Sequence, residues 1–203
     1  ALEEAGLILG EGAPPAGVLP LLSVADAWTE RAGVRWLVDG LISEGSLCIF
    51  AGAAGARKTW ALMNLGVCLA AGVDWLGRET VQCPVLWIDE ELCAPRFLER
   101  LRRVLTGLGF EAGDSLPFYA LSGLGVNFFG QPRDLDLVIG AIERVGAKVV
   151  FFDALADIAT GADENSARDM GLVIANLRAL IKATGATVIL IHHSNRAGGY
   201  RGS

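Results

Sequence analysis

Long hydrophobic runs are missing from this sequence. Hydrophobic residues make up 52% of its 203 positions, yet no apolar stretch approaches the roughly 18 residues that a transmembrane helix needs. The opening segment, ALEEAGLILGEG, also lacks the basic start of a secretory signal peptide. These absences argue against a membrane-spanning helix and against export, so we expect a cytoplasmic protein with a large core.

Paired cysteines and excess positive charge are missing as well. The cysteine spacing gives neither a C-x-x-C pair nor a set of zinc ligands, so we expect reduced thiols at Cys48, Cys68, Cys83 and Cys93. The net charge is -6 and the isoelectric point is about 4.9. The surface as a whole should therefore repel nucleic acid, and any contact with DNA or RNA must be local.

What the sequence does contain is an alternation of strands with helices. Strands, most of them continuously apolar, are predicted at residues 47–50, 84–88, 116–121, 148–152 and 187–191. Helices are predicted at residues 58–71, 95–105, 132–145 and 166–184. This order is typical of an α/β domain in which helices cover both faces of a mostly parallel sheet, giving three layers.

The predicted domain covers residues 23–203. Residues 1–22 are rich in Ala, Gly and Pro without a sustained period, so we expect an N-terminal arm there. The last residues, 196–203, are glycine-rich and follow a strand and its loop. We therefore expect the natural chain to continue beyond Ser203.

A loop of small residues joins the first predicted strand to the first predicted helix. Its sequence, GAAGARKT, follows the pattern G-x-x-x-x-G-K-[ST] with one departure. Backbone N–H groups in such a loop and the positive end of the helix dipole bind a polyphosphate. Lys58 would reach the β- and γ-phosphates and Thr59 would bind Mg²⁺. The expected nucleotide-binding residues are Gly52, Ala53, Ala54, Gly55, Ala56, Arg57, Lys58, Thr59 and Trp60.

The departure is Arg57, which stands where the pattern has its second glycine. If the backbone φ is positive there, a residue with a side chain loses about 1 kcal/mol or more of conformational free energy relative to glycine. The side chain also narrows the space under the phosphates. Two interpretations stay open: Arg57 adds a cation to the phosphate site, or it makes the loop a weak or structural binder. Trp36, a short distance upstream, either belongs to the core or flanks the nucleotide base.

Polar side chains follow three further predicted strands: Asp89-Glu90-Glu91, Asp153 and His192-His193. The carboxyl ends of parallel strands meet at one edge of a sheet, so these residues should line the same crevice as the loop. We expect Asp153 to hold Mg²⁺ and one of the three acids to act as a base or orient water, the others forming a solvated turn. Adjacent strand residues point to opposite sides, so one histidine should contact the γ-phosphate and the other should pack or be exposed.

The order and spacing of the phosphate loop and the three polar strand ends resemble those of the RecA-fold ATPases. Among these, they resemble the RepA-like group of hexameric replicative helicases, often labelled AAA-type ATPases. The resemblance covers residues 34–203. It rests on RWLVDGLISEG, GAAGARKT, VLWIDEEL, VVFFDALADIATGADENSARDM and VILIHHSNR followed by RGS. It implies a RecA-like P-loop NTPase fold with ATP and Mg²⁺ as cofactors.

The resemblance also implies roles for single residues. Lys58 and Thr59 match the Walker A pair, and Asp153 matches the Walker B aspartate. Glu91 falls where the family has its catalytic glutamate, with Glu90 as the second choice.

Two further residues complete the resemblance. His193 matches the polar sensor of the γ-phosphate, and Arg201 resembles the arginine that such rings insert into the neighbouring subunit's site. The resemblance thus implies that six copies of the chain form a ring. It also implies that this ring moves on single-stranded DNA during plasmid or phage replication. The channel loops, residues 154–165 and 194–203, contain acidic as well as basic side chains and offer DNA little clustered positive charge.

A second interpretation belongs to a different class of protein. The chain would then be a regulatory or recombination-type RecA-fold ATPase, or a pseudo-ATPase whose nucleotide only organises an assembly. Arg57 in the phosphate loop favours this alternative. Stimulation of ATP hydrolysis by DNA distinguishes the motor from the scaffold.

Overall fold

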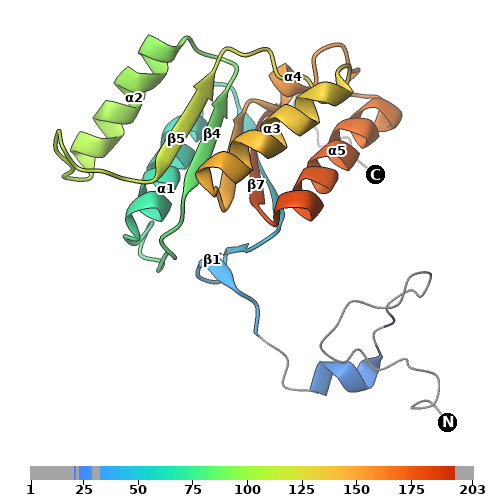
Figure 1. Cartoon of the computed structure of the whole chain (residues 1–203), viewed down its shortest axis with the longest axis horizontal. Coiled ribbons are helices and arrows are strands. Elements are labelled where there is room, and N and C mark those ends of the chain that lie inside the picture. Colours follow the sequence, from blue (N-terminus) through green and yellow to red (C-terminus); the bar gives the residue numbers. More distant parts are fainter. Residues whose placement is uncertain (1–20, 22, 29–32, 195–203) are drawn as a thin grey trace. The chain divides into compact units, whose positions relative to one another are not determined.

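The computed structural model describes residues 21, 23–28 and 33–194 (Figure 1). Contacts divide the chain into two units, Ala1–Val34 and Arg35–Ser203, whereas the sequence analysis placed the boundary after residue 22. In the first unit, the short 3-10 helix η1 (Val24–Trp28) has Ser23 before it, whose backbone N–H and hydroxyl both donate to the Asp26 carboxylate. Among the described residues, no helix is both long and apolar enough to span a bilayer.

A parallel sheet forms the centre of the second unit. Within the described residues it has five strands in the order β3-β7-β6-β4-β5, and every neighbouring pair is parallel. In chain order these are β3 (Leu47–Ala53), β4 (Val85–Asp89), β5 (Phe118–Ser122), β6 (Val149–Asp153) and β7 (Thr187–Ser194). All residues of β4 and β6 are buried, as expected for central strands covered on both faces.

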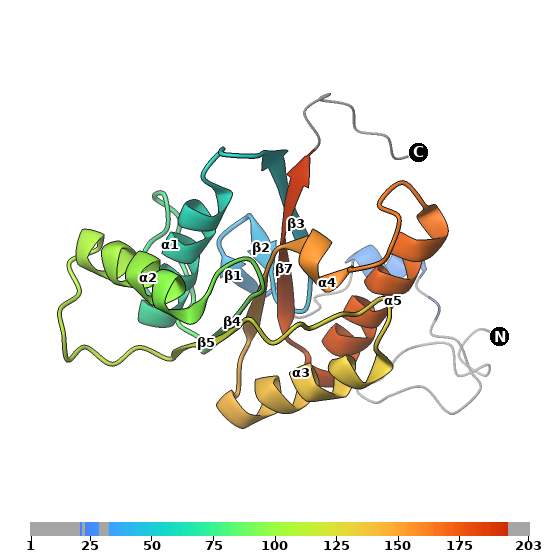
Figure 2. The same ribbon diagram turned by 90° about the horizontal axis from the view of Figure 1, so that it is seen from above.

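Helices cover both faces of this sheet (Figure 2). One face carries α1 (Lys58–Ala71) and α2 (Ala94–Gly107), and the other carries α3 (Pro132–Val145) and α5 (Ala167–Thr184). The single-turn helix α4 (Leu155–Ile158) follows β6. The predicted mostly parallel sheet between two helical layers is thereby confirmed.

The core consists of two clusters because side chains alternate along each strand. Trp87 and Phe151 face α1 and α2, where their rings stack with centroids 4.8 Å apart. Phe152 faces α3 and α5 and meets Phe128 edge-on at 5.5 Å. The paired register of β4 and β6 therefore places matching residues in the same layer.

Two strands are longer than predicted. The apolar runs end at Phe50 in β3 and Ile191 in β7, but the two strands continue to pair beyond these residues. The additional pairs are Ala51 with His192, Gly52 with His193, and Ala53 with Ser194. Ladder hydrogen bonds use only the backbone, so small and polar residues extend a strand that has a partner. His193 is thereby fixed beside the beginning of the phosphate loop.

Of the two interpretations of Trp36, the structure contradicts the first, a place in the core, whereas contact with the nucleotide base stays a prediction. Trp36 lies in the hairpin of β1 (Trp36–Val38) and β2 (Ile42–Ser43) and is 38% exposed, so it is not a core residue. Its two neighbours in β1, Leu37 and Val38, are buried instead. Nor does Trp36 line the pocket described below.

Candidate functional site

The phosphate loop and the ends of β4 and β7 enclose a pocket of about 300 Å³. The strands are parallel, so their carboxyl ends open onto the same edge of the sheet. The pocket is lined by Gly55, Arg57, Lys58, Thr59, Trp60, Glu91, Arg100 and His193. All of these except Arg100 are residues that the sequence analysis assigned to the site.

The Lys58 ammonium lines this pocket and is bonded to the phosphate loop. Its Nζ donates to the carbonyl oxygens of Gly52 at 2.7 Å and Ala53 at 3.0 Å, and lies 3.0 Å from His193 Nδ1. An ammonium can only donate, so Nδ1 accepts this hydrogen bond and the neutral ring carries its proton on Nε2. His193 is thus prepared to donate from Nε2 to an anion in the pocket.

Arg57 is in the left-handed region, with φ 61° and ψ 28°. The backbone φ of Arg57 is therefore positive, and the expected conformational cost of about 1 kcal/mol applies to this residue. Arg57 precedes the first turn of α1, and no side chain caps this helix. The first N–H groups of α1 are left for an anion.

The other loop residues contribute less to the pocket lining. Gly52 and Ala53 provide carbonyl oxygens for Lys58 and do not line the pocket. Ala54 and Ala56 belong to the loop without lining the pocket either. Trp60, in the first turn of α1, does line it.

Asp153, at the end of β6, is 1% exposed, and within the described part of the chain neither carboxylate oxygen has a hydrogen-bond partner. Burial raises the pKa of Asp153 to about 7, and the negative charge of Glu91 contributes in the same direction. The Thr59 hydroxyl opposes this shift in pKa but falls short of hydrogen-bond geometry. A buried carboxylate without a partner needs a cation or ordered water beside it.

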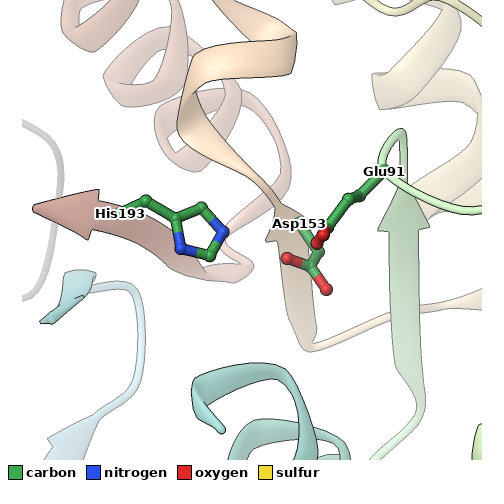
Figure 3. Close-up of side chains that lie close together, drawn as sticks. All are labelled: Glu91, Asp153 and His193. Carbon is green, nitrogen blue, oxygen red and sulfur yellow. The ribbon is translucent and has the colours of Figure 1, made fainter. Parts of the chain in front are cut away.

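Three potential metal ligands converge at this point (Figure 3). One ligand atom each from Glu91, Asp153 and His193 lie within 4.8 Å of one another. Mg²⁺ prefers oxygen ligands and keeps part of its water shell, whereas the His193 ring is already engaged by Lys58. The unpartnered oxygens of Asp153, together with the buried Thr59, therefore fit Mg²⁺.

The other two acids that follow β4 have structural partners. Asp89 accepts hydrogen bonds from Leu92 N at 3.2 Å and Ser122 Oγ at 3.4 Å, and its burial raises its pKa. The expectation of a solvated acidic turn is wrong for Asp89, which is 0% exposed because the turn folds back over it. Glu90 accepts from the backbone N–H groups of Gly125 and Val126. Of these three acids, Glu91 is the one that lines the pocket.

Two residues complete the comparison with the sequence analysis. Arg201 lies outside the described residues. Arg100 was missed because the helix predicted at residues 95–105 was not connected with the crevice. The overlooked signal was position: α2 begins just after Glu91, so its second turn passes the same crevice.

Comparisons with known proteins agree with this description of the fold. The family model of the AAA domain matches residues 13–199. Among solved structures, the KaiC-like protein PH0186 from the hyperthermophilic archaeon Pyrococcus horikoshii OT3 matches with a TM-score of 0.51 and 19% identity, over 78% of this chain and 65% of that chain. At this identity the likeness concerns the fold alone, and it confirms the predicted RecA-like fold. The comparison with curated proteins gave no match.

Proposed function

Because this chain belongs to the AAA domain family, we propose that it binds ATP with Mg²⁺ at the phosphate loop and hydrolyses it as a RecA-fold motor. One observation carries the proposal. Lys58 at the start of α1, Glu91 after β4, Asp153 at the end of β6 and His193 near the end of β7 gather at one site. Cation, carboxylates and imidazole together provide what phosphoryl transfer to water requires.

Binding of the triphosphate uses the loop and the start of α1. Lys58 would exchange its bonds to the Gly52 and Ala53 carbonyl oxygens for bonds to the β- and γ-phosphates. The uncapped N–H groups of α1 add partial positive charge. Thr59 and Asp153 would hold Mg²⁺, which supplies neutralisation of the phosphate charge when bound.

Hydrolysis requires a positioned water molecule. Glu91 is exposed, lines the pocket and has its carboxylate beside Asp153, so we assign it the role of orienting the water and accepting its proton. His193 would donate from Nε2 to the γ-phosphate while Nδ1 stays bonded to Lys58. Each group acts by position and charge, which is how phosphoryl transfer is catalysed.

The finer proposal is a ring-forming replicative DNA helicase of a plasmid or phage type, with six subunits. It is supported by the motif order given above, and Arg201 would be the arginine that reaches the neighbouring site. The net charge of -6 requires that DNA be bound by a local set of basic groups.

A second candidate is an ATPase of the regulatory or recombination type, or a scaffold that binds nucleotide without turnover. The left-handed Arg57 favours it, because a side chain at this position departs from the usual loop. So does Lys58, which ATP must first detach from two carbonyl oxygens.

ATP hydrolysis with and without single-stranded DNA separates these candidates. The motor predicts turnover that DNA stimulates and that Glu91→Gln lowers by about 10² to 10⁴-fold. Glu90→Gln is the matched control, since the Glu90 carboxylate is bonded to the Gly125 and Val126 N–H groups, and it should keep most of the activity. Nucleotide-dependent assembly without turnover would favour the scaffold, and a protein that binds no ATP would contradict both.

A further inference from the structure

Arg100, in the second turn of α2, is a cation that the sequence analysis did not assign to the site. It is half-buried and lines the pocket next to Lys58 and Glu91. Its guanidinium carbon lies 5.7 Å from the centroid of the Trp60 ring. Among the described residues its guanidinium takes part in no hydrogen bond and no ion pair.

Other arginines of the same helix behave differently. Arg103 forms an i,i+4 ion pair with Glu99 at the surface. Arg102 is exposed and does not line the pocket. A half-buried guanidinium loses part of its hydration, and a bound anion would offset that loss more than the contact with the Trp60 ring does. The anion that this pocket is built for is a phosphate.

We propose that Arg100 is a further catalytic residue, supplied by the same chain, that contacts the terminal phosphate of ATP, and that Trp60 positions it. The inference rests on the proposed function and adds a second cation to that site. A guanidinium presents its N–H groups as a planar fork that matches two phosphate oxygens. The face of the Trp60 ring restricts the rotamers of Arg100 before the nucleotide arrives.

The electrostatics of the site agree with this assignment. The positive charge of Arg100 acts to lower the pKa of Asp153, so it reaches the carboxylate that is expected to hold the metal. Lys58 approaches the same pocket from the loop, on a different element. Two cations on separate elements can both stabilise the negative charge that shifts between the phosphates in the transition state.

The test compares binding of ATP and ADP, each with Mg²⁺, because only ATP has the terminal phosphate. Arg100→Gln should weaken ATP binding about 10- to 100-fold, as expected for a lost charge-assisted contact, and leave ADP binding nearly unchanged. The rate of hydrolysis at saturating ATP should fall as well. Arg102→Gln removes the same charge from the exposed side of the helix and should change neither quantity.

Arg100→Lys keeps the positive charge but loses the planar arrangement of N–H donors. Compared with Arg100→Gln, it should therefore restore part of the preference for ATP over ADP and little of the rate of hydrolysis. Trp60→Phe keeps an aromatic face and should lower the rate of hydrolysis less than Trp60→Leu, which removes the face that positions Arg100. In the Arg100→Gln background, Trp60→Leu should have little further effect, because the side chain that it positions is gone.

The outcomes separate this inference from the proposed function. If wild type binds ATP and Lys58→Ala binds it more weakly, but Arg100→Gln keeps the wild-type ATP preference and rate, the role of Arg100 is overturned alone. If wild type binds no ATP, the proposed function is overturned and this inference with it. Should Arg100→Gln fail to fold, as judged by circular dichroism, Arg100→Lys decides: a wild-type rate and ATP preference would overturn the assignment.

Discussion

Arg57 holds a backbone conformation that glycine adopts more easily than any other residue. Its φ of 61° brings the Cβ close to the backbone, at a cost of roughly 1 kcal/mol. Its side chain is exposed and, within the described residues, forms no hydrogen bond or ion pair that would offset this cost. The arginine therefore lowers the stability of the nucleotide-free protein, whatever it contributes to binding.

Arg57→Gly should raise the free energy of unfolding by about 1 kcal/mol, because glycine relieves the strain. Urea denaturation without nucleotide measures the change. Arg57→Ala is the matched control: it removes the guanidinium but keeps a Cβ, so its stability should stay near that of wild type. Equal gains from both variants would show that the side chain, and not the backbone, is the source of the cost.

At the residue scale, the sequence predicts best where a side chain follows a strand directly. Asp153 ends an apolar run and lies beside Glu91 and His193, two residues that line the pocket. After β4, three acids in a row made the choice among Asp89, Glu90 and Glu91 depend on how the turn folds, which periodicity does not encode. Arg100 was overlooked for a related reason, since its place in the pocket depends on the path of the chain after Glu91.

At the scale of elements, glycines decide where helices end and how closely they pack. Gly72 and Gly146 follow α1 and α3 with φ of 71° and 64°, so each ends its helix in a left-handed cap. Gly66, inside α1, has a different role. A Cβ there would lie 2.9 Å from Cε2 of Phe118 and 3.4 Å from Cε2 of Phe151, so α1 packs against these rings only without a side chain at this position.

Alanine substitutions should therefore have opposite effects in two helices. Gly140 lies inside α3, is exposed, and would have no atom within 4 Å of an added Cβ. Gly140→Ala should stabilise the protein by about 0.5 to 1 kcal/mol through helix propensity. Gly66→Ala should destabilise it by about 1 kcal/mol, because crowding against the rings exceeds that gain. Thermal unfolding of both variants checks this, and a gain for Gly66→Ala equal to that for Gly140→Ala would contradict the packing argument.

Predicted element bounds were accurate where a local signal marks them. The predicted bounds of α1 and α3 coincide with the observed ones, because α1 follows the phosphate loop, α3 begins with Pro132, and a glycine follows each helix. The ends of β3 and β7 were placed too early, since their last residues are held by each other across the sheet. A pairing between residues so far apart in the sequence leaves no local pattern.

At the scale of the molecule, the RecA-like fold of the second unit brings groups from distant segments to one edge of its sheet. Lys58, Glu91, Asp153 and His193 are dispersed along the sequence, and the parallel sheet together with the phosphate loop and the turn after β4 brings them together. The net charge of -6 opposes binding of a polyanion, so a triphosphate depends on this local cluster. The central claim is therefore that the cluster is a nucleotide site.

Calorimetric titration of the whole chain with ATP and Mg²⁺ tests this claim most directly. Wild type should bind, and Lys58→Ala should bind about 10- to 150-fold more weakly, the loss expected for a charge-assisted contact of 1.5 to 3 kcal/mol. Lys182→Ala, which removes an exposed lysine in the last turn of α5, should bind like wild type. ATP binding that is the same in all three proteins would contradict the account.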